Sequence, residues 1–471
     1  MIIQLPKKVK EILDTFEKGG FEIYIAGGAV RDILLGKIVY DWDFTTNATP
    51  EEMQKLFPDS FYDNVFGTVG IPPEIEGERP YEITTYRTEY GYSDSRRPDK
   101  VKWGKNLEED LERRDFTINA MALKIDSGHW TLDSSKKSKK TRDQRLETSD
   151  YEIIDLFNGR TDLEKKFIRA VGDPKKRFSE DALRMMRAVR IAAELNFKIE
   201  PKTLASIQKN SHLINKIAKE RVRDELLKIL ASPHPYQGML LFRESKLMDE
   251  ILPEMEKCFG IGQKSPGRHH IYDVGTHSLL SLKFVSEINP DPVVRLATMI
   301  HDIGKPVTRK VQNNGVVTFY NHELVSGRIA KDIAKRLRFS KKQAEKFYKL
   351  VRYHQFTVNE NQTDSAIRRF IRKVELENVE DMLDLRIGDR LGGGARETSW
   401  RLEEFKKRLV EVQKQPFTVH DLKISGNDVM KELNISPGPK VGEVLEKLFE
   451  EVVEKNLENE KDTLLKRLKE F

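Results

Sequence analysis

The chain has one cysteine, Cys258, among 471 residues, so an internal disulfide is excluded. Such a cysteine more often packs as a small hydrophobic side chain than reacts. No stretch approaches the roughly 20 consecutive apolar residues of a membrane-spanning helix. The opening Met-Ile-Ile-Gln-Leu-Pro does not have the pattern of a signal peptide. We therefore expect a cytoplasmic protein without a membrane partner.

A large excess of charge of one sign is also absent. The 82 lysine and arginine residues face 76 aspartate and glutamate residues, which leaves a formal net charge of +6. Any nucleic-acid partner must then bind a local basic surface, because the chain as a whole is nearly balanced. The length suffices for about three domains with substantial cores.

The most informative stretch is Tyr40-Asp41-Trp42-Asp43-Phe44, which predicts a strand with two different faces. Alternate side chains of a strand point to opposite faces, so the aromatic residues can be buried while Asp41 and Asp43 share the other face. Their carboxylates, about 7 Å apart along the strand, repel each other unless cations lie between them, and Mg²⁺ prefers such oxygen ligands. Taken alone, the pattern also fits an edge strand with a solvated acidic face.

The flanking sequence favours a nucleotide site. We predict a strand over Ile23–Ala26, a tight turn at Gly27-Gly28 and a short helix over Ala29–Leu35. The turn places backbone N–H groups and a helix N-terminus beside the carboxylate strand, where a triphosphate can bind. Thr49-Pro50 then opens another helix, with the threonine as N-cap.

The run Gly27-Gly28-Ala29-Val30-Arg31-Asp32, followed by Asp41-Trp42-Asp43-Phe44, resembles the class II tRNA nucleotidyltransferases, the CCA-adding enzymes, and their poly(A) polymerase relatives. The resemblance implies an α+β fold with a polymerase β-like nucleotidyltransferase head on a mixed β-sheet, followed by helical domains. It also implies that Asp41 and Asp43 hold catalytic Mg²⁺. Glu82, on a predicted strand over residues 81–87, matches the third catalytic carboxylate; without the family it would be a surface residue.

The resemblance extends to nucleotide recognition. Arg114 offers donors for a phosphate, and Asp115 and Asn119 can bond a ribose 2′-hydroxyl. A predicted helix with Ser179 as N-cap begins a further motif at residue 178. The nucleotide-binding residues implied are Gly27, Gly28, Arg31, Arg114, Asp115, Asn119, Asp181, Arg184, Arg187 and Arg190.

Asp181 and Arg184 are three residues apart, which on a helix places them on one face. Together they offer an acceptor beside a donor, which complements the Watson–Crick edges of C and A and mismatches those of U and G. Buried mispaired groups can be rejected by ~10⁴-fold, so no nucleic-acid template is required. A surface salt bridge is the alternative interpretation.

Two polar segments are expected to be loops. Residues 88–105 match the flexible loop that the family needs for the final A, and its completeness argues against a C-only enzyme. Residues 136–150 are rich in lysine and predict a disordered or mobile insertion. Asn158 stands where the family usually has glycine, and asparagine tolerates the left-handed conformation.

A second candidate metal site lies beyond residue 235. His277, the pair His301-Asp302 and Asp389 resemble the HD phosphohydrolases, in which a divalent metal activates water against a phosphoester. His322 and His354 can complete a larger cluster. Related enzymes suggest 2′,3′-cyclic phosphodiesterase or phosphatase work on RNA ends, and a metal-braced structural domain is the alternative.

We therefore predict a head over residues 1–150, a base-recognising helical neck over 151–235, a helical body with the HD-type site over 236–411 and a tRNA-binding tail over 412–471. The expected function is template-independent addition of C, C and A to the tRNA 3′ end from CTP and ATP, with release of pyrophosphate. The alternatives are an A-adding specialist, a poly(A) polymerase and, from another class, an HD phosphohydrolase or RNA-binding protein. The sequence gives no indication of the oligomeric state.

Overall fold

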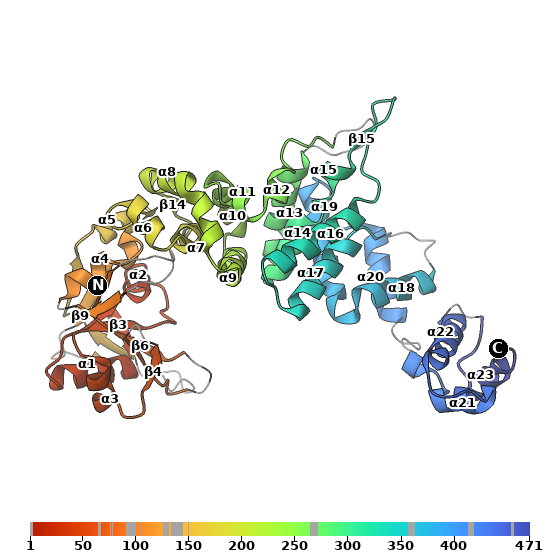
Figure 1. Cartoon of the computed structure of the whole chain (residues 1–471), viewed down its shortest axis with the longest axis horizontal. Coiled ribbons are helices and arrows are strands. Elements are labelled where there is room, and N and C mark those ends of the chain that lie inside the picture. Colours follow the sequence, from red (N-terminus) through yellow and green to blue (C-terminus); the bar gives the residue numbers. More distant parts are fainter. Residues whose placement is uncertain are drawn as a thin grey trace. The chain divides into compact units, whose positions relative to one another are not determined.

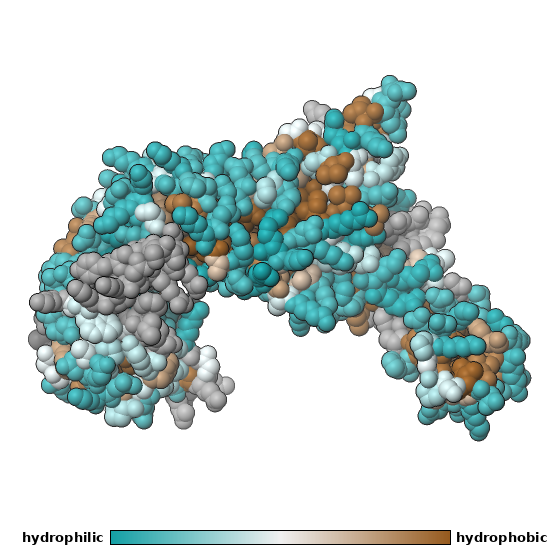
Figure 2. All heavy atoms as spheres, viewed as in Figure 1, coloured by the Kyte–Doolittle hydropathy of each residue, from teal (hydrophilic) through white to brown (hydrophobic). Residues whose placement is uncertain are grey.

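In the computed structural model the chain divides into two units, Met1–Pro253 and Glu254–Phe471 (Figure 1). The finer division into four domains stays a prediction. Hydrophilic side chains cover most of the visible face of both units (Figure 2). Among the described residues, no helix is both long and apolar enough to cross a membrane. The structure describes residues 3–64, 67–75, 77, 79–90, 100–104, 106–125, 131–132, 145–148, 150–263, 272–356, 363–412, 419–453 and 456–471.

The first unit contains a seven-stranded sheet in the order β12-β9-β2-β3-β6-β5-β4. Strands β3 and β6 pair in parallel and the other neighbours pair antiparallel, so the predicted mixed sheet and α+β class are confirmed. The strands are β2 Ile23–Ala26, β3 Asp43–Thr46, β4 Phe61–Asn64, β5 Thr68–Ile71, β6 Tyr81–Thr85, β9 Met121–Ile125 and β12 Tyr151–Asp155.

Short-range sequence signals determine the first helices. Helix α1 (Lys7–Lys18) buries one apolar stripe that includes Val9 and Phe16. Helix α2 (Gly28–Leu34) follows the Gly27 turn. Helix α3 (Pro50–Leu56) begins at the predicted cap, where the Thr49 hydroxyl and the Glu52 side chain each bond the other residue's backbone N–H.

The carboxylate strand begins later than predicted. β3 starts at Asp43, and the Tyr40 side chain is 81% exposed, whereas Trp42 and Phe44 are buried. The prediction that all three aromatic residues share a buried face was therefore wrong for Tyr40. The reason is that β2 pairs with β3 only from Phe44 onward, because the chain turns into α2 after Ala26.

Both segments predicted as loops contain strands. β7 (Arg87–Tyr90) and β8 (Lys100–Trp103) pair antiparallel, and residues 91–99 lie outside the described residues. β11 (Arg145–Thr148) pairs with β1 (Ile3–Pro6) and β10 (Thr131–Leu132). The prediction of a disordered insertion was therefore wrong for residues 145–148, because backbone pairing with distant strands overrides a polar composition.

Helices complete the first unit: α4 Leu107–Glu112, α5 Gly159–Glu164, α6 Pro174–Glu180, α7 Leu183–Leu195, α8 Pro201–Asn210, α9 Lys219–Ala231, α10 Pro235–Glu244 and α11 Leu247–Ile251. Asn158, before α5, has φ +61° as expected for the left-handed conformation. The helix predicted to begin near Ser179 is instead two helices, because Asp181 interrupts it in an extended conformation. Ser179 is not an N-cap; its hydroxyl donates to the carbonyl of Lys176.

The second unit is mainly helical and has one antiparallel strand pair, β15 Lys310–Val311 with β16 Val317–Thr318. Helix α12 (Pro253–Glu256) begins at the last residue of the first unit. The further helices are α13 Val274–Ile288, α14 Pro292–Ile300, α15 Lys305–Thr308, α16 His322–Arg336, α17 Lys341–Tyr353, α18 Asp364–Val374, α19 Val379–Gly392, α20 Trp400–Val412, α21 Gly426–Leu433, α22 Pro439–Val453 and α23 Lys461–Leu468. Helices α13 and α19 pack closely where two glycines of α19 face α13. A Cβ on Gly392 would overlap the Ser281 hydroxyl and lie 2.7 Å from the Ser281 backbone N. This close approach brings His277 on α13 near Asp389 on α19.

Gly392→Ala should therefore separate α13 from α19. We expect the free energy of unfolding to fall by about 1–3 kcal/mol, the usual range for overpacking a tight contact. Amide hydrogen exchange in both helices should become faster. Gly393→Ala is the matched control, since a Cβ there has no neighbour closer than 3.5 Å and φ is −82°. Equal exchange rates in the two variants would contradict this account of the helix contact.

Candidate active sites

Three carboxylates gather at one end of β3 and β6. Asp43 and Glu82 are direct partners in the parallel register, so their side chains lie side by side on one face of the sheet. Asp41 lies two residues before Asp43, with a half-exposed side chain that accepts a hydrogen bond of 2.7 Å from the Arg79 guanidinium. The sequence did not predict a role for Arg79, because the residues just before β6 follow neither a helical nor a strand pattern.

The environment of Asp43 disfavours its anion. Burial raises the pKa of Asp43 to about 6; the Arg114 guanidinium opposes the shift, and the Asp41 and Glu82 carboxylates add to it. A divalent cation among these oxygens would reverse that balance, because it stabilises the ionised carboxylates. The chemistry of these oxygen ligands suits a hard divalent metal ion.

Gly27 keeps backbone close to these carboxylates. Its φ is +69°, and a Cβ there would lie 2.8 Å from Nη1 of Arg114 and 3.4 Å from Oδ2 of Asp43. The left-handed conformation and the close approach both require glycine. The turn after β2 thus lies directly beside the carboxylates, which is what a phosphate cradle there would need.

Other predicted nucleotide-binding residues belong to a network of ion pairs and hydrogen bonds. Arg31 donates to the Asn119 side chain at 3.0 Å, and Arg187 pairs with Asp115 at 2.8 Å. Asp110, which no sequence motif indicated, is fully buried one helical turn before Arg114 and pairs with it at 3.0 Å. Burial alone would raise the pKa of Asp110, but the Arg113 and Arg114 guanidinium groups lower it to about 2. Asp110 thereby fixes the Arg114 side chain next to Gly27.

The residues predicted to read the base have separate partners. Arg184 donates to the Glu180 carboxylate at 2.6 Å and to the backbone carbonyl of Arg113 at 3.3 Å. Asp181 accepts from Arg221 at 3.1 Å. The expectation that Asp181 and Arg184 lie on the face of one helix was wrong, because α6 ends before Asp181 and α7 begins after it.

Arg190 has a different position from the other predicted nucleotide-binding residues. Its guanidinium pairs at 2.8 Å with both Glu194 on α7 and Glu225 on α9. These two ion pairs link the helices of the neck. In this structure Arg190 is therefore a brace between α7 and α9.

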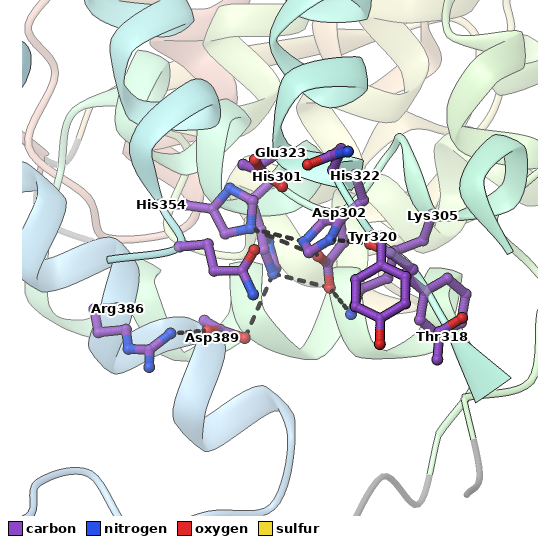
Figure 3. Close-up of a pocket in the computed structure, with 13 residues that line it drawn as sticks. His301, Asp302, Lys305, Thr318, Tyr320, His322, Glu323, His354, Arg386 and Asp389 are labelled. Atoms are coloured by element: carbon purple, nitrogen blue, oxygen red, sulfur yellow. Dashed lines mark hydrogen bonds and ion pairs between the residues drawn. The ribbon is translucent and has the colours of Figure 1, made fainter. Parts of the chain in front are cut away.

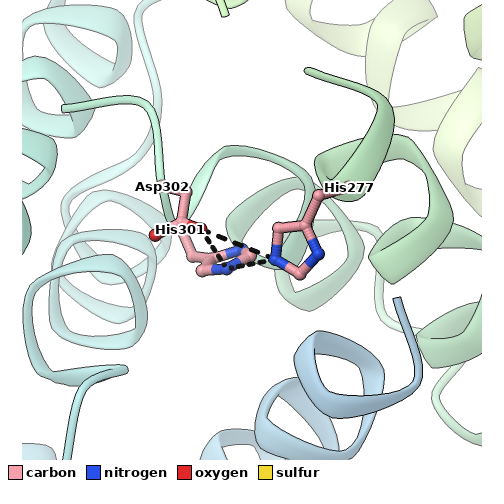
Figure 4. A group of neighbouring side chains, drawn as sticks. All are labelled: His277, His301 and Asp302. Atoms are coloured by element: carbon pink, nitrogen blue, oxygen red, sulfur yellow. Dashed lines mark hydrogen bonds and ion pairs between the residues drawn. The ribbon is translucent and has the colours of Figure 1, made fainter. Parts of the chain in front are cut away.

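The second candidate site brings together histidines and aspartates from five parts of the second unit (Figures 3 and 4). Oδ2 of Asp302 lies 3.2 Å from Nε2 of His301 and 3.5 Å from Nε2 of His277. Oδ1 of Asp302 lies 3.2 Å from His322 and 3.7 Å from His354. Asp302 thus joins two potential metal-binding groups, His277–His301–Asp302 and Asp302–His322–His354.

Asp389 completes the first group, with Oδ1 at 3.1 Å from His277 and 3.4 Å from His301. All six residues predicted for this site are therefore assembled. His269 and His270, in the sequence leading to His277, lie outside the described residues.

Backbone carbonyls orient three of the imidazoles. Nδ1 of His301 lies 2.7 Å from the carbonyl of Thr298, and Nδ1 of His354 lies 2.7 Å from that of Val351. His322 has the same arrangement at 2.8 Å, with the carbonyl of Phe319. A proton on Nδ1, donated to the carbonyl, leaves Nε2 as the atom that faces the cluster and can bind a metal ion, which is the arrangement that metal-ligating histidines need.

The carboxylates of Asp302 and Asp389 need a positive charge beside them. Burial alone would lower the pKa of His301, but the Asp302 and Asp389 carboxylates raise it to about 10. Burial and the neighbouring His301 lower the pKa of His354 to about 3. One imidazole thus carries a proton opposite two carboxylates, and a divalent metal would displace that proton and satisfy the same charge.

The cluster opens into a cavity of about 460 Å³ (Figure 3). Two cationic side chains line it beside the candidate ligands: Lys305 pairs with Asp302 at 2.6 Å, and Arg386 pairs with Asp389 at 3.2 Å. Sequence reasoning missed Arg386, although it stands one helical turn before Asp389. A ligand with a negative charge, such as a phosphate, is compatible with this lining.

A change at Asp43 tests the electrostatics of the head. Because the folded head raises the Asp43 pKa, protonation of Asp43 stabilises the fold fully below about pH 3.8, and this contribution is lost as the pH rises through about 6. In chelator, Asp43→Asn should therefore raise the midpoint of head unfolding at pH 8, and the gain should shrink toward pH 4. The control is Asp59→Asn, at an exposed position of the same unit. A midpoint lowered equally at both pH values would contradict the electrostatic assignment.

Comparisons with known proteins agree with the head geometry. Residues 23–169 match the family model described as the Poly A polymerase head domain. Residues 196–259 match "Probable RNA and SrmB- binding site of polymerase A", and residues 318–468 match tRNA nucleotidyltransferase domain 2. These three models do not include an HD phosphohydrolase, so that part of the resemblance stays a prediction.

Curated relatives carry the name CCA-adding enzyme. The relative from Ligilactobacillus salivarius is 33% identical over 467 residues, which cover 99% of this chain and 96% of that protein. The relative from Lactobacillus helveticus is 45% identical over 245 residues, 52% of this chain and 55% of that protein. A crystal structure of the Bacillus stearothermophilus CCA-adding enzyme in complex with CTP covers 98% of this chain and 96% of its own, with a TM-score of 0.69 and 27% identity. The protein belongs to the CCA-adding enzyme family, the tRNA nucleotidyltransferases with a poly(A) polymerase-type head.

Proposed function

We propose that this protein adds C, C and A in order to the 3′ end of tRNA, using CTP and ATP and no nucleic-acid template. The observation that carries the proposal is the pairing of Asp43 with Glu82 across β3 and β6, directly beside Gly27. The curated relatives that match nearly the whole chain are named CCA-adding enzymes. The A-adding specialist and the poly(A) polymerase are therefore not favoured.

In the proposed reaction, Asp41, Asp43 and Glu82 hold Mg²⁺. Two Mg²⁺ ions bound there would supply Lewis-acid chemistry at the attacking tRNA hydroxyl and the leaving pyrophosphate. At neutral pH most Asp43 carboxylates are ionised and able to bind a cation, since the pKa is about 6. Arg114, held by Asp110 beside Gly27, presents its guanidinium to the triphosphate.

In this proposal, residues of the neck select the base of the incoming nucleotide. The Arg184 guanidinium and the Asp181 carboxylate are both largely buried, and each already bonds a group of opposite charge. A bound C or A can offer its acceptor to Arg184 and its donor to Asp181 in place of these contacts, while Glu180 keeps its ion pair with Arg177 at 3.1 Å. A bound U or G places donor against donor and acceptor against acceptor, at a cost that permits strong discrimination.

Removing a carboxylate from the head should abolish nucleotide addition and preserve the fold. Asp41→Ala and Asp43→Ala should each lower incorporation of labelled CTP and ATP into a tRNA transcript by at least about 10³-fold, because a catalytic metal loses a ligand. Asp59→Ala, at an exposed site of the same unit, is the control. Near-normal incorporation by a folded, pure Asp41→Ala protein would overturn the assignment.

A second function is favoured by the histidine cluster, in which one carboxylate joins two groups of three candidate ligands. We propose that this site binds divalent metal ions and hydrolyses phosphoesters at RNA ends. Such an ion would activate water, as in other two-metal sites. Lys305 and Arg386, which line the cavity, would bind the phosphate.

Asp302→Asn should separate the two functions. With Mn²⁺ present, we expect the variant to lose hydrolysis of adenosine 2′,3′-cyclic phosphate by at least about 10²-fold, since the bridging ligand is weakened. Addition of C, C and A by the head should continue at the wild-type rate. Wild-type protein that binds no Mn²⁺ at the cluster would instead support a purely structural role for these residues.

A further inference from the structure

A second cavity adjoins the one at the histidine cluster. It has a volume of about 610 Å³, within the usual range for small-molecule sites. Gln355 and Arg386 line both cavities, so the two meet at these side chains. A ligand in the second cavity would therefore lie beside Arg386, which pairs with Asp389 of the cluster.

The second cavity exposes a large aromatic side chain. Trp400 is the first residue of α20 and is 63% exposed, whereas Leu402 and Phe405 of the same helix are buried. Other residues of α20 therefore pack against the core, and the indole ring of Trp400 stays at the surface. An exposed tryptophan in a cavity wall offers a flat surface on which a planar ring can stack.

The remaining lining is cationic. Arg386, Arg390 and Arg401 all face this cavity, and among the described lining residues none is acidic. The guanidinium of Arg401 lies 5.2 Å from the centre of the Trp400 ring, and Arg390 is held by the carbonyl of Arg396 at 3.0 Å. An aromatic surface among arginines suits a ligand that combines a planar ring with negative charge, because stacking and phosphate contacts can form together.

We propose that this second cavity binds the nucleoside of the phosphoester hydrolysed at the histidine cluster, with the base stacked on Trp400 and the phosphate beside Arg386. The ligand class is a nucleoside phosphate, either a free nucleotide or the terminal nucleotide of an RNA. The proposal rests on the phosphohydrolase function proposed above. It deepens that function, because it states why the site selects nucleotides over other phosphoesters.

The test compares two cyclic phosphodiesters that differ in the base. The full-length protein with Mn²⁺ receives adenosine 2′,3′-cyclic phosphate or glycerol 1,2-cyclic phosphate. Trp400→Leu should raise KM for the adenosine compound about tenfold, in the range of one lost stacking contact, and leave kcat and the glycerol compound unchanged. Trp400→Phe, which retains an aromatic ring, should stay close to wild type.

Two outcomes separate the nucleoside cavity from the phosphohydrolase. If the wild-type protein hydrolyses both compounds and Trp400→Leu behaves as wild type on each, the nucleoside cavity is overturned and the phosphohydrolase stands. If the wild-type protein hydrolyses neither compound, the phosphohydrolase is overturned. Binding of adenosine 3′-phosphate, measured by equilibrium dialysis, then decides the cavity: weaker binding to Trp400→Leu supports it, and equal or absent binding overturns it.

A third substrate identifies the source of the ligand. A short RNA that ends in a 2′,3′-cyclic phosphate is compared with the free nucleotide in wild type and Trp400→Leu. A rise in KM that is several-fold larger for the RNA than for the free nucleotide supports an RNA end as the ligand. A similar rise for both substrates supports recognition of any nucleoside phosphate.

Discussion

The head depends on one electrostatic constraint, the placement of Asp43 and Glu82 as direct partners on two parallel strands. Burial and like charge disfavour the ionised Asp43, so a bound cation or a proton must offset them. The surrounding groups follow from this constraint. Gly27 leaves room for the Arg114 guanidinium, and Asp110 fixes that guanidinium near the carboxylates. The sheet thereby gives up some stability to keep these carboxylates together.

The second unit also contains two site carboxylates, and there imidazoles lie beside them and offset their charge. Asp302 and Asp389 are carboxylates surrounded by histidines, and carbonyl groups orient three of those rings. Close packing of α13 against α19 at Gly392 brings the first group together. Here the helix contact, rather than a strand register, sets the geometry of the site.

The sequence was sufficient where neighbouring residues determine the structure, as in the Thr49 cap, the left-handed Asn158 and the strand that carries Glu82. It was insufficient where contacts between residues far apart in the sequence determine the structure. The break at Asp181 goes with a pairing to Arg221 on another helix, and the strand over residues 145–148 depends on β1. Family motifs indicated which residues assemble at each site. They did not include Asp110, Arg386 or Trp400, whose positions follow from tertiary packing.

The most direct test of the account offers the purified protein, with Mg²⁺, three tRNA transcripts that end at the discriminator base, at C and at CC. Each transcript receives CTP, ATP, UTP and GTP singly and together, and the products are sized. The account predicts C, C and A in order, then termination, with no use of UTP or GTP. Addition of A alone to the CC transcript, long A tails or no incorporation would each contradict it.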